Sequence, residues 1–138
     1  MNIEQAFSPK NEDIDFLSRK INEESKAIGI NQEAYPFAFF IRGGNGQIIA
    51  GCNGWVIYGS IYTDQLWVHI DYRGQGWGRK LMDKVHEYGS EAGCKFATVA
   101  TMSFQNARKF YEHLGYRCDF ERKGYANGAT CWFLRKSI

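Results

Sequence analysis

The first apolar residues of the chain recur at helical spacing among polar ones. Ile14, Leu17 and Ile21 are three or four positions apart, which places them on one side of a helix. A serine and a proline shortly before them are typical of a helix start. The pattern therefore predicts a helix that ends near Ile28, preceded by a short strand over 2–7.

β-prone runs occupy the middle of the chain. Two of them, over 37–42 and 47–58, flank the sequence Gly-Gly-Asn-Gly, whose residues tolerate positive φ, so an antiparallel hairpin is predicted. A third run, over 61–70, carries apolar residues on one face. We expect this run to form one unbroken strand.

Helical spacing returns twice in the second half. Apolar residues between 81 and 92 line one side of a helix, charged residues line the other, and a glycine follows. The run over 96–101 is predicted to be a strand parallel to the one before the helix, because a strand, a helix and a strand of this length form a crossover unit. A helix over 107–114 and strands over 116–121 and 130–136 complete an α/β (α+β mixed) pattern.

The composition indicates one globular domain spanning residues 1–138. A chain of 138 residues with 44% hydrophobic and 23% charged residues can bury a core of its own. Its net charge is +2, and no clustered basic stripe is visible, so nucleic acid is not expected as a partner.

The cysteines and the apolar runs indicate which cellular compartment the protein occupies and whether a metal or a membrane is expected. The four cysteines show neither CxxC spacing nor histidines at zinc-site intervals, so we expect reduced thiols and no metal. The first residues lack signal-peptide character, and no apolar run approaches about 18 residues, so no membrane partner is expected. Together these features predict a cytoplasmic protein.

A glycine-rich turn, Arg73-Gly74-Gln75-Gly76-Trp77-Gly78, joins the predicted strand over 61–70 to a helix. Small residues let backbone amides approach an anion, and the helix N-terminus adds its dipole. A tight turn that needs glycine only for its conformation explains the same pattern equally well. The dinucleotide-binding pattern fails because position 79 is arginine and the chain lacks a second half, and the P-loop pattern is absent.

Two segments in order resemble one known family. Residues 68–82, Val-His-Ile-Asp-Tyr-Arg-Gly-Gln-Gly-Trp-Gly-Arg-Lys-Leu-Met, resemble motif A of the GNAT superfamily of N-acetyltransferases, with its signature Arg/Gln-x-x-Gly-x-Gly/Ala. Residues 106–116, Asn-Ala-Arg-Lys-Phe-Tyr-Glu-His-Leu-Gly-Tyr, resemble its motif B. Two departures are Ile70, where many members carry proline, and Trp77, where an aliphatic residue is usual.

The resemblance implies a fold and an activity. The fold is a mixed, mostly antiparallel sheet with a splayed pair of parallel strands, flanked by helices on both faces. The activity is that of an acyltransferase, which moves an acetyl group from acetyl-CoA to a primary amine by direct transfer in a ternary complex. Carried onto this chain, the implied cofactor-binding residues are Trp67, Val68, His69, Ile70, Arg73, Gly74, Gln75, Gly76, Trp77, Gly78, Arg79 and Asn106.

The resemblance also implies a proton donor. Tyr111 matches the family tyrosine that protonates the departing thiolate, and a phenol suits this step because its reference pKa of about 10 is near the value of about 8.5 for a thiol. Periodicity alone favours simple packing for Tyr111, because it lies on the apolar side of its helix. The amide of Val68 is the implied donor to the developing oxyanion.

The general base is less sharply defined. Asp64 lies on the predicted strand over 61–70, where a carboxylate can accept a proton from an amine, although a surface position explains it equally well. His69 has the better reference pKa, about 6.5, but strand alternation puts it on the opposite face unless the strand contains a bulge. His86 and His113 are predicted to be solvated residues on helix surfaces.

The sequence does not identify the amine that accepts the acetyl group. Residues 28–37, the start of the strand over 61–70 and the loop over 122–129 are expected to form its pocket. Their aromatic and acidic side chains suit a small cationic amine, and a peptide amine fits nearly as well. A non-catalytic acyl-CoA-binding sensor domain is the alternative from another class, and a homodimer is compatible with the sequence.

Overall fold

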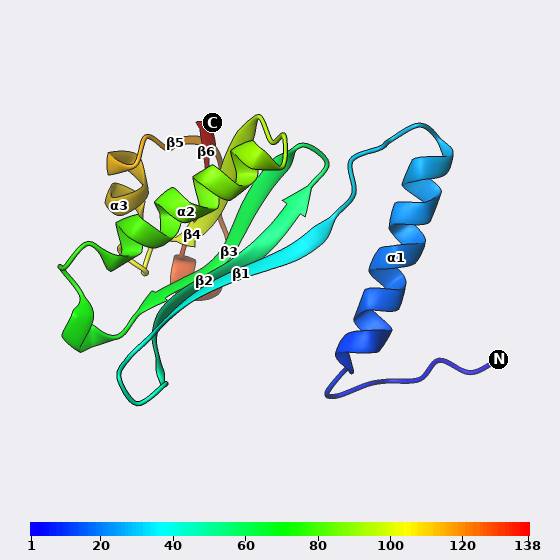
Figure 1. The fold of residues 1–138 in the computed structure, drawn as a ribbon, viewed down its shortest axis with the longest axis horizontal. Helices are drawn as coiled ribbons and strands as arrows, with labels where there is room; N and C mark the ends of the chain where they lie inside the picture. The colour runs from blue at the N-terminus through cyan, green and yellow to red at the C-terminus, as the bar shows by residue number, and fades with distance from the viewer.

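The computed structural model describes residues 1–138. Its elements are α1 (Asn11–Ala27), β1 (Tyr35–Arg42), β2 (Ile48–Ile57), β3 (Ser60–Val68), η1 (Ile70–Tyr72), α2 (Trp77–Glu91), β4 (Phe96–Met102), α3 (Arg108–His113), β5 (Arg117–Arg122), η2 (Ala126–Gly128) and β6 (Cys131–Ser137). The six strands form one sheet in the order β1-β2-β3-β4-β6-β5 (Figure 1). Only β3 and β4 run parallel, so the predicted mixed, mostly antiparallel sheet is confirmed.

Every helix and strand predicted from residue 11 onward forms, with ends shifted by a residue or two. The strand predicted over 2–7 is wrong, because these residues have no regular structure. A strand is stabilised by hydrogen bonds to a neighbouring strand, and this segment has none beside it. Ile3 is fully exposed and Phe7 largely exposed as a result.

The expectation of one unbroken strand over 61–70 is also wrong. In the pairing of β2 with β3, Asn53 lies opposite Gln65 and Gly54 lies opposite Thr63, so Asp64 is the extra residue of a β-bulge. A Cβ at Gly54 would lie 1.8 Å from the carbonyl oxygen of Tyr62, so only glycine fits at this crossing.

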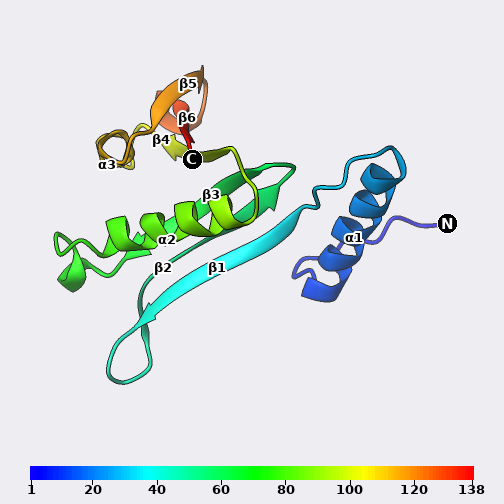
Figure 2. The same cartoon turned by 45° about the horizontal axis from the view of Figure 1, so that its top comes forward.

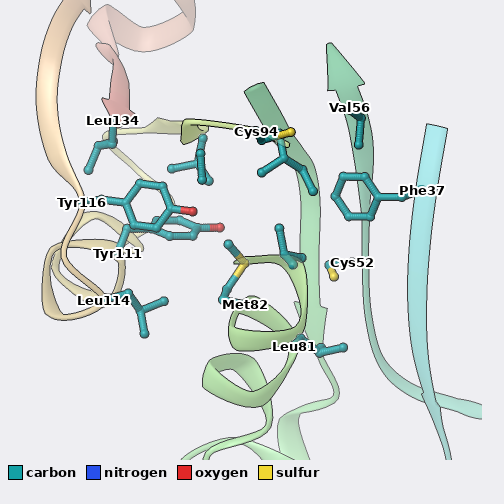
Figure 3. Close-up of a cluster of buried hydrophobic side chains, with 14 of the residues drawn as sticks. Phe37, Cys52, Val56, Leu81, Met82, Cys94, Tyr111, Leu114, Tyr116 and Leu134 are labelled. Atoms are coloured by element: carbon teal, nitrogen blue, oxygen red, sulfur yellow. The ribbon is translucent and has the colours of Figure 1, made fainter. Parts of the chain in front are cut away.

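The core lies between the sheet and the two helices α2 and α3. Met82 of α2, Tyr111 of α3 and Leu114, which follows α3, belong to one buried cluster (Figure 3). Val85 of α2 belongs to the same cluster. Gly89 brings α2 close to the sheet, because a Cβ there would meet a side-chain carbon of Ile61 at 2.7 Å. Both helices are therefore fixed against the strands that carry the candidate site.

The parallel strands β3 and β4 separate part-way along their length. They pair only from Ser60 opposite Phe96 to Thr63 opposite Val99, although both strands continue beyond this last pair. The bulge at Asp64 begins where the pairing stops. The strands therefore form the splayed pair that the family resemblance implies.

Helix α1 stands apart from the sheet, beyond the edge strand β1, in both views (Figures 1 and 2). None of its residues is buried.

None of the helices has the length and apolar character needed to cross a bilayer.

Candidate active site

The glycine turn between η1 and α2 presents its backbone openly. Gly74 and Gly76 have φ values of +72° and +87°, which favour glycine, and no atom lies within 4 Å of the position that a Cβ would take at either residue. Gly78 has a different role, because a Cβ there would lie 3.3 Å from the ring of Phe110 on α3. Small residues thus leave the turn accessible and allow α3 to approach it.

The glycine turn and its neighbours line a groove with a volume of 490 Å³. Seven of the predicted cofactor-binding residues lie along it, and three further residues, Tyr72, Phe110 and His113, were not predicted. His113 was expected to be a solvated helix residue; it is exposed, but at the wall of this groove. The complete lining is Val68, Tyr72, Arg73, Gly74, Gly76, Trp77, Gly78, Arg79, Phe110 and His113.

The groove suits an anion. Arg73 and Arg79 contribute two guanidinium groups, and Arg73 is held by a 2.8 Å hydrogen bond from its Nε to the carbonyl oxygen of Val68. The N-terminus of α2 points its free amides toward the same turn. The indole of Trp77 lies under the ammonium of Lys80, 4.4 Å from it, and its buried N–H has no partner.

The other five predicted cofactor-binding residues lie outside the groove lining. His69 caps η1, since its Nδ1 accepts a hydrogen bond from the backbone amide of Asp71 at 3.2 Å. The side-chain amide of Gln75 donates a hydrogen bond to the carbonyl oxygen of Asp71 at 3.2 Å. Asn106 adopts a φ of +58° just before α3, which by itself explains an asparagine there. The remaining two are Trp67, on the other face of the sheet, and the exposed Ile70.

Tyr111 is buried in the core beside Tyr116 (Figure 3), and the two ring centroids lie 5.6 Å apart. The ring centroid of Phe110 lies 5.1 Å from that of Tyr111. Burial raises the pKa of Tyr111 to about 12. The phenol therefore stays protonated at neutral pH and can act as a donor. Tyr62 of β3 is near enough to contribute to this increase in pKa, which links Tyr111 to the bulged strand.

The bulge presents Asp64 outward beside Tyr62. The hydroxyl of Tyr62 donates to Oδ1 of Asp64 at 3.3 Å, and burial together with this carboxylate raises the pKa of Tyr62. Because the bulge adds one residue, it reverses the strand parity beyond position 64. The alternation argument that placed His69 on the opposite face from Asp64 therefore does not hold. The Nδ1 of His69, however, already accepts a hydrogen bond as the cap of η1.

Comparison with known proteins decides the family. The family model described as "Acetyltransferase (GNAT) domain" matches residues 36–118, which include the whole groove and Tyr111. The chain belongs to the GNAT acetyltransferase family. It is accordingly an acyltransferase.

Relatives of this GNAT acetyltransferase agree with that assignment. The blasticidin-S acetyltransferase of Streptomyces morookaense is 33% identical over 110 residues, which cover 77% of this chain and 80% of the relative. A crystal structure of an acetyltransferase from Bacillus cereus has a TM-score of 0.76, 22% identity and 98% coverage of both chains. A Bacillus anthracis protein solved in complex with acetyl coenzyme A has a TM-score of 0.69 and 17% identity, covering 79% of this chain and 65% of that one.

His86 of the GNAT acetyltransferase does not match its predicted role as a solvated residue. It is only partly exposed, and its Nε2 forms a 2.8 Å hydrogen bond with the hydroxyl of Tyr116, thirty residues away in sequence. Burial lowers the pKa of His86 from 6.5 to about 4. The prediction failed because a helical position shows nothing of a distant tyrosine that covers it.

Replacing His86 by glutamine is expected to flatten the acid dependence of stability. In the parent, the unfolded state binds a proton at His86 near pH 6.5 and the folded state only near pH 4, so the free energy of unfolding falls as the pH drops through that window. The contribution is roughly 1–3 kcal/mol after screening of the half-buried ring. Urea unfolding of both proteins between pH 4 and 7 measures it, and equal slopes would exclude His86 as the source.

The segments expected to form one acceptor pocket of the GNAT acetyltransferase are separate. Glu33 and Tyr35 line a hollow with α1, and the loop around Asn127 lines another with Phe104. Asp64 lies in neither of these hollows. No three side chains of the His, Cys, Asp and Glu types come together as a metal site would require.

Proposed function

We propose that this chain transfers an acetyl group from acetyl-CoA to a primary amine of a small molecule, by direct transfer in a ternary complex. Residues 1–138 would act as one N-acetyltransferase domain. The observation that carries the proposal is the position of the basic, glycine-lined groove at the end of β3, the strand that separates from β4, with Tyr111 buried in the neighbouring core. An extended ligand with an anionic end fits this arrangement.

The groove and the adjoining edge of β3 would hold different parts of acetyl-CoA. The amides from Gly74 to Gly78 and the guanidinium groups of Arg73 and Arg79 would hold the pyrophosphate. The unpaired part of β3, up to Val68, would hold the pantetheine arm by backbone hydrogen bonds. The complex of the Bacillus anthracis structure with acetyl coenzyme A supports this choice of cosubstrate.

Acetyl-CoA would supply a thioester, and three groups of this chain would serve the transfer. The amide of Val68 would stabilise negative charge on the carbonyl oxygen. Tyr111 would give its proton to the departing sulfur, and Asp64 would accept the proton of the amine, directly or through water. The hydrogen bond from Tyr62 holds the Asp64 carboxylate in place at the bulge.

A small-molecule acceptor is supported by the blasticidin-S acetyltransferase relative, which shares a third of its residues with this chain over most of both lengths. The exposed carboxylate of Asp64 beside the hydroxyl of Tyr62 suits a cationic amine. We also propose a homodimer and a cytoplasmic location, the latter supported by four free cysteines.

A thiol-release assay with acetyl-CoA and a panel of amines tests the function. The panel contains an aminated nucleoside, an aminoglycoside, a polyamine and peptides with a free N-terminus or lysine. Turnover with a small amine and thermal stabilisation by acetyl-CoA are expected. Turnover with peptides only would overturn the small-molecule assignment, and stabilisation without any turnover would indicate a sensor domain instead.

Replacing Asp64 by asparagine is expected to lower kcat/KM about 100-fold or more and to remove the acid limb of its pH profile, because a base must be deprotonated to act. The matched control is Asp71→Asn, which removes a carboxylate of an exposed turn residue near the groove. Steady-state rates across pH measure both variants. An acid limb that persists in the Asp64 variant would assign the base to His69 or to water.

A further inference from the structure

Helix α1 exposes its apolar side. Ile14, Leu17 and Ile21, which we call the apolar stripe, are 42%, 57% and 55% exposed. The helix is attached to the molecule by its polar flank instead: Asn22 exchanges hydrogen bonds of 2.8 and 2.9 Å with the backbone of Ala34. An amphipathic helix with its polar side inward and its apolar side in water lacks a partner for the apolar side.

The sheet has an apolar face that also lacks a partner. Phe37 and Phe39 of β1 contact Tyr88 of α2, so the alternate residues point to the opposite face. On that side, Phe40, Ile48 and Trp67 are 55%, 40% and 47% exposed and line a groove of 520 Å³ over Gly51. We call this the open face.

The edge of the sheet beside the open face is free as well. Strand β1 has β2 as its only neighbour, so its outer backbone groups are unpaired. Segment 2–7 is the complementary element, since it has no regular structure and no neighbouring strand. The chain thus carries an unpartnered N-terminal segment and helix, and an unpartnered edge and face.

We propose that the N-terminal arm, residues 1–28, docks on the open face and the free β1 edge of a second copy of this chain. Each copy gives its arm and receives the other, so the contact closes with two-fold symmetry. The apolar stripe would cover Phe40 and Trp67, and residues 2–7 would extend the sheet beyond β1.

Dimensions and charges agree with this occupant. Helix α1 has 17 residues and spans about 25 Å, and the eight residues of β1 span about 26 Å. Two helices and two open faces, each contributing a strip about 10 Å wide, bury about 1,000 Å², which meets the lower limit of a biological interface before the added strands are counted. Asp13 and Glu24 border the apolar stripe, and Arg42 lies at the rim of the open face, 6.0 Å from the ring of Phe40.

A second copy fits better than closure of the arm on its own sheet. The connection over 28–34 leads α1 away from β1 in both views (Figures 1 and 2), and the Asn22–Ala34 bonds hold it there. Closure within one chain would break these bonds, whereas exchange keeps them. The similarity to the Bacillus cereus structure covers 98% of this chain, so it includes this arm.

The molecular mass in solution provides the first test, and it requires neither acetyl-CoA nor an acceptor. Light scattering is expected to give twice the chain mass of 15.9 kDa for the parent. The double variant Leu17→Glu/Ile21→Glu is expected to give the monomer mass. The matched control is Phe16→Glu, because Phe16 is equally exposed but lies on the opposite side of α1. A monomeric parent, or loss of the dimer in the control alone, would overturn the proposal.

Cross-linking separates exchange from self-closure. In a Cys118→Ser background, chains with cysteine in place of Ile14, Leu17 or Ile21 are refolded together with chains carrying Phe40→Cys or Trp67→Cys, and then oxidised. A disulfide between two different chains is expected for at least one pair. If doubly substituted chains instead form only internal disulfides, the arm covers its own sheet; if no link forms, the open face receives some other partner. Either result contradicts the exchange.

Discussion

Replacement of Tyr111 by phenylalanine is expected to lower kcat by about 10²–10⁴-fold and to leave KM for acetyl-CoA nearly unchanged, because a proton donor acts in the transition state and not in cosubstrate binding. Burial raises the pKa of Tyr111 to about 12, well above that of a thiol in water. This difference alone would make proton transfer to the sulfur costly.

The same burial acts on thiols in this part of the molecule. Cys52 belongs to the same buried cluster as Tyr111, and burial raises its pKa to about 11. Burial would also raise the pKa of a sulfur that departs in such surroundings, which would bring the pKa values of the phenol and the thiol closer together. The core position of Tyr111, which favoured mere packing from the sequence, is thus compatible with proton donation.

The matched control for this variant is Tyr116→Phe. Tyr116 is a buried tyrosine in ring contact with Tyr111, and its hydroxyl is bonded to His86. Its loss is expected to cost about 1 kcal/mol of stability and to leave kcat within a few-fold of the parent. Steady-state kinetics and urea unfolding of both variants distinguish chemistry from packing. Equal rates in Tyr111→Phe and the parent would remove Tyr111 from the mechanism.

Replacement of Gly54 by alanine is expected to lower the free energy of unfolding by about 3 kcal/mol or more. The added Cβ would lie 1.8 Å from the carbonyl oxygen of Tyr62, and a contact with backbone cannot be relieved by rotating a side chain. Strands β2 and β3 would have to separate at the bulge. Activity should fall as well, because the bulge sets the position of Asp64.

Gly44→Ala is the control for this substitution. Gly44 has no atom within 4 Å of the added Cβ and does not have a positive φ, so a change within about 0.5 kcal/mol is expected. Urea unfolding of the two variants gives the comparison. If both variants were equally stable, the close crossing of β2 and β3 at Gly54 would not exist in solution.

The sequence predicted the features that depend on neighbouring residues. The helix over 77–91 and the β1–β2 hairpin follow from periodicity and from glycines, and both form as expected. The glycine turn was placed correctly because its pattern is contiguous. Of the candidate site, the loop side and the buried position of Tyr111 could be foreseen for the same reason.

The features that sequence reasoning missed depend on contacts between distant residues. The bulge at Asp64 is set by Gly54 on the neighbouring strand, and Phe110 reaches the groove because Gly78 leaves it room. His86 is shielded by Tyr116. Segment 2–7 was predicted to be a strand, but no strand lies beside it, and the local sequence cannot show that.

The separation of β3 and β4 leaves two parts of the sheet connected by only a short stretch of backbone pairing. The sheet consists of two parts, one formed by β1, β2 and β3 and the other by β4, β6 and β5. The backbone pairing between the two parts extends only from Ser60 to Thr63. Beyond Thr63 the two parts are joined by packing on α2 and α3 and not by backbone hydrogen bonds. A ligand that filled this opening and contacted both strands would connect the two parts of the sheet, so ligand binding is expected to make the sheet stiffer.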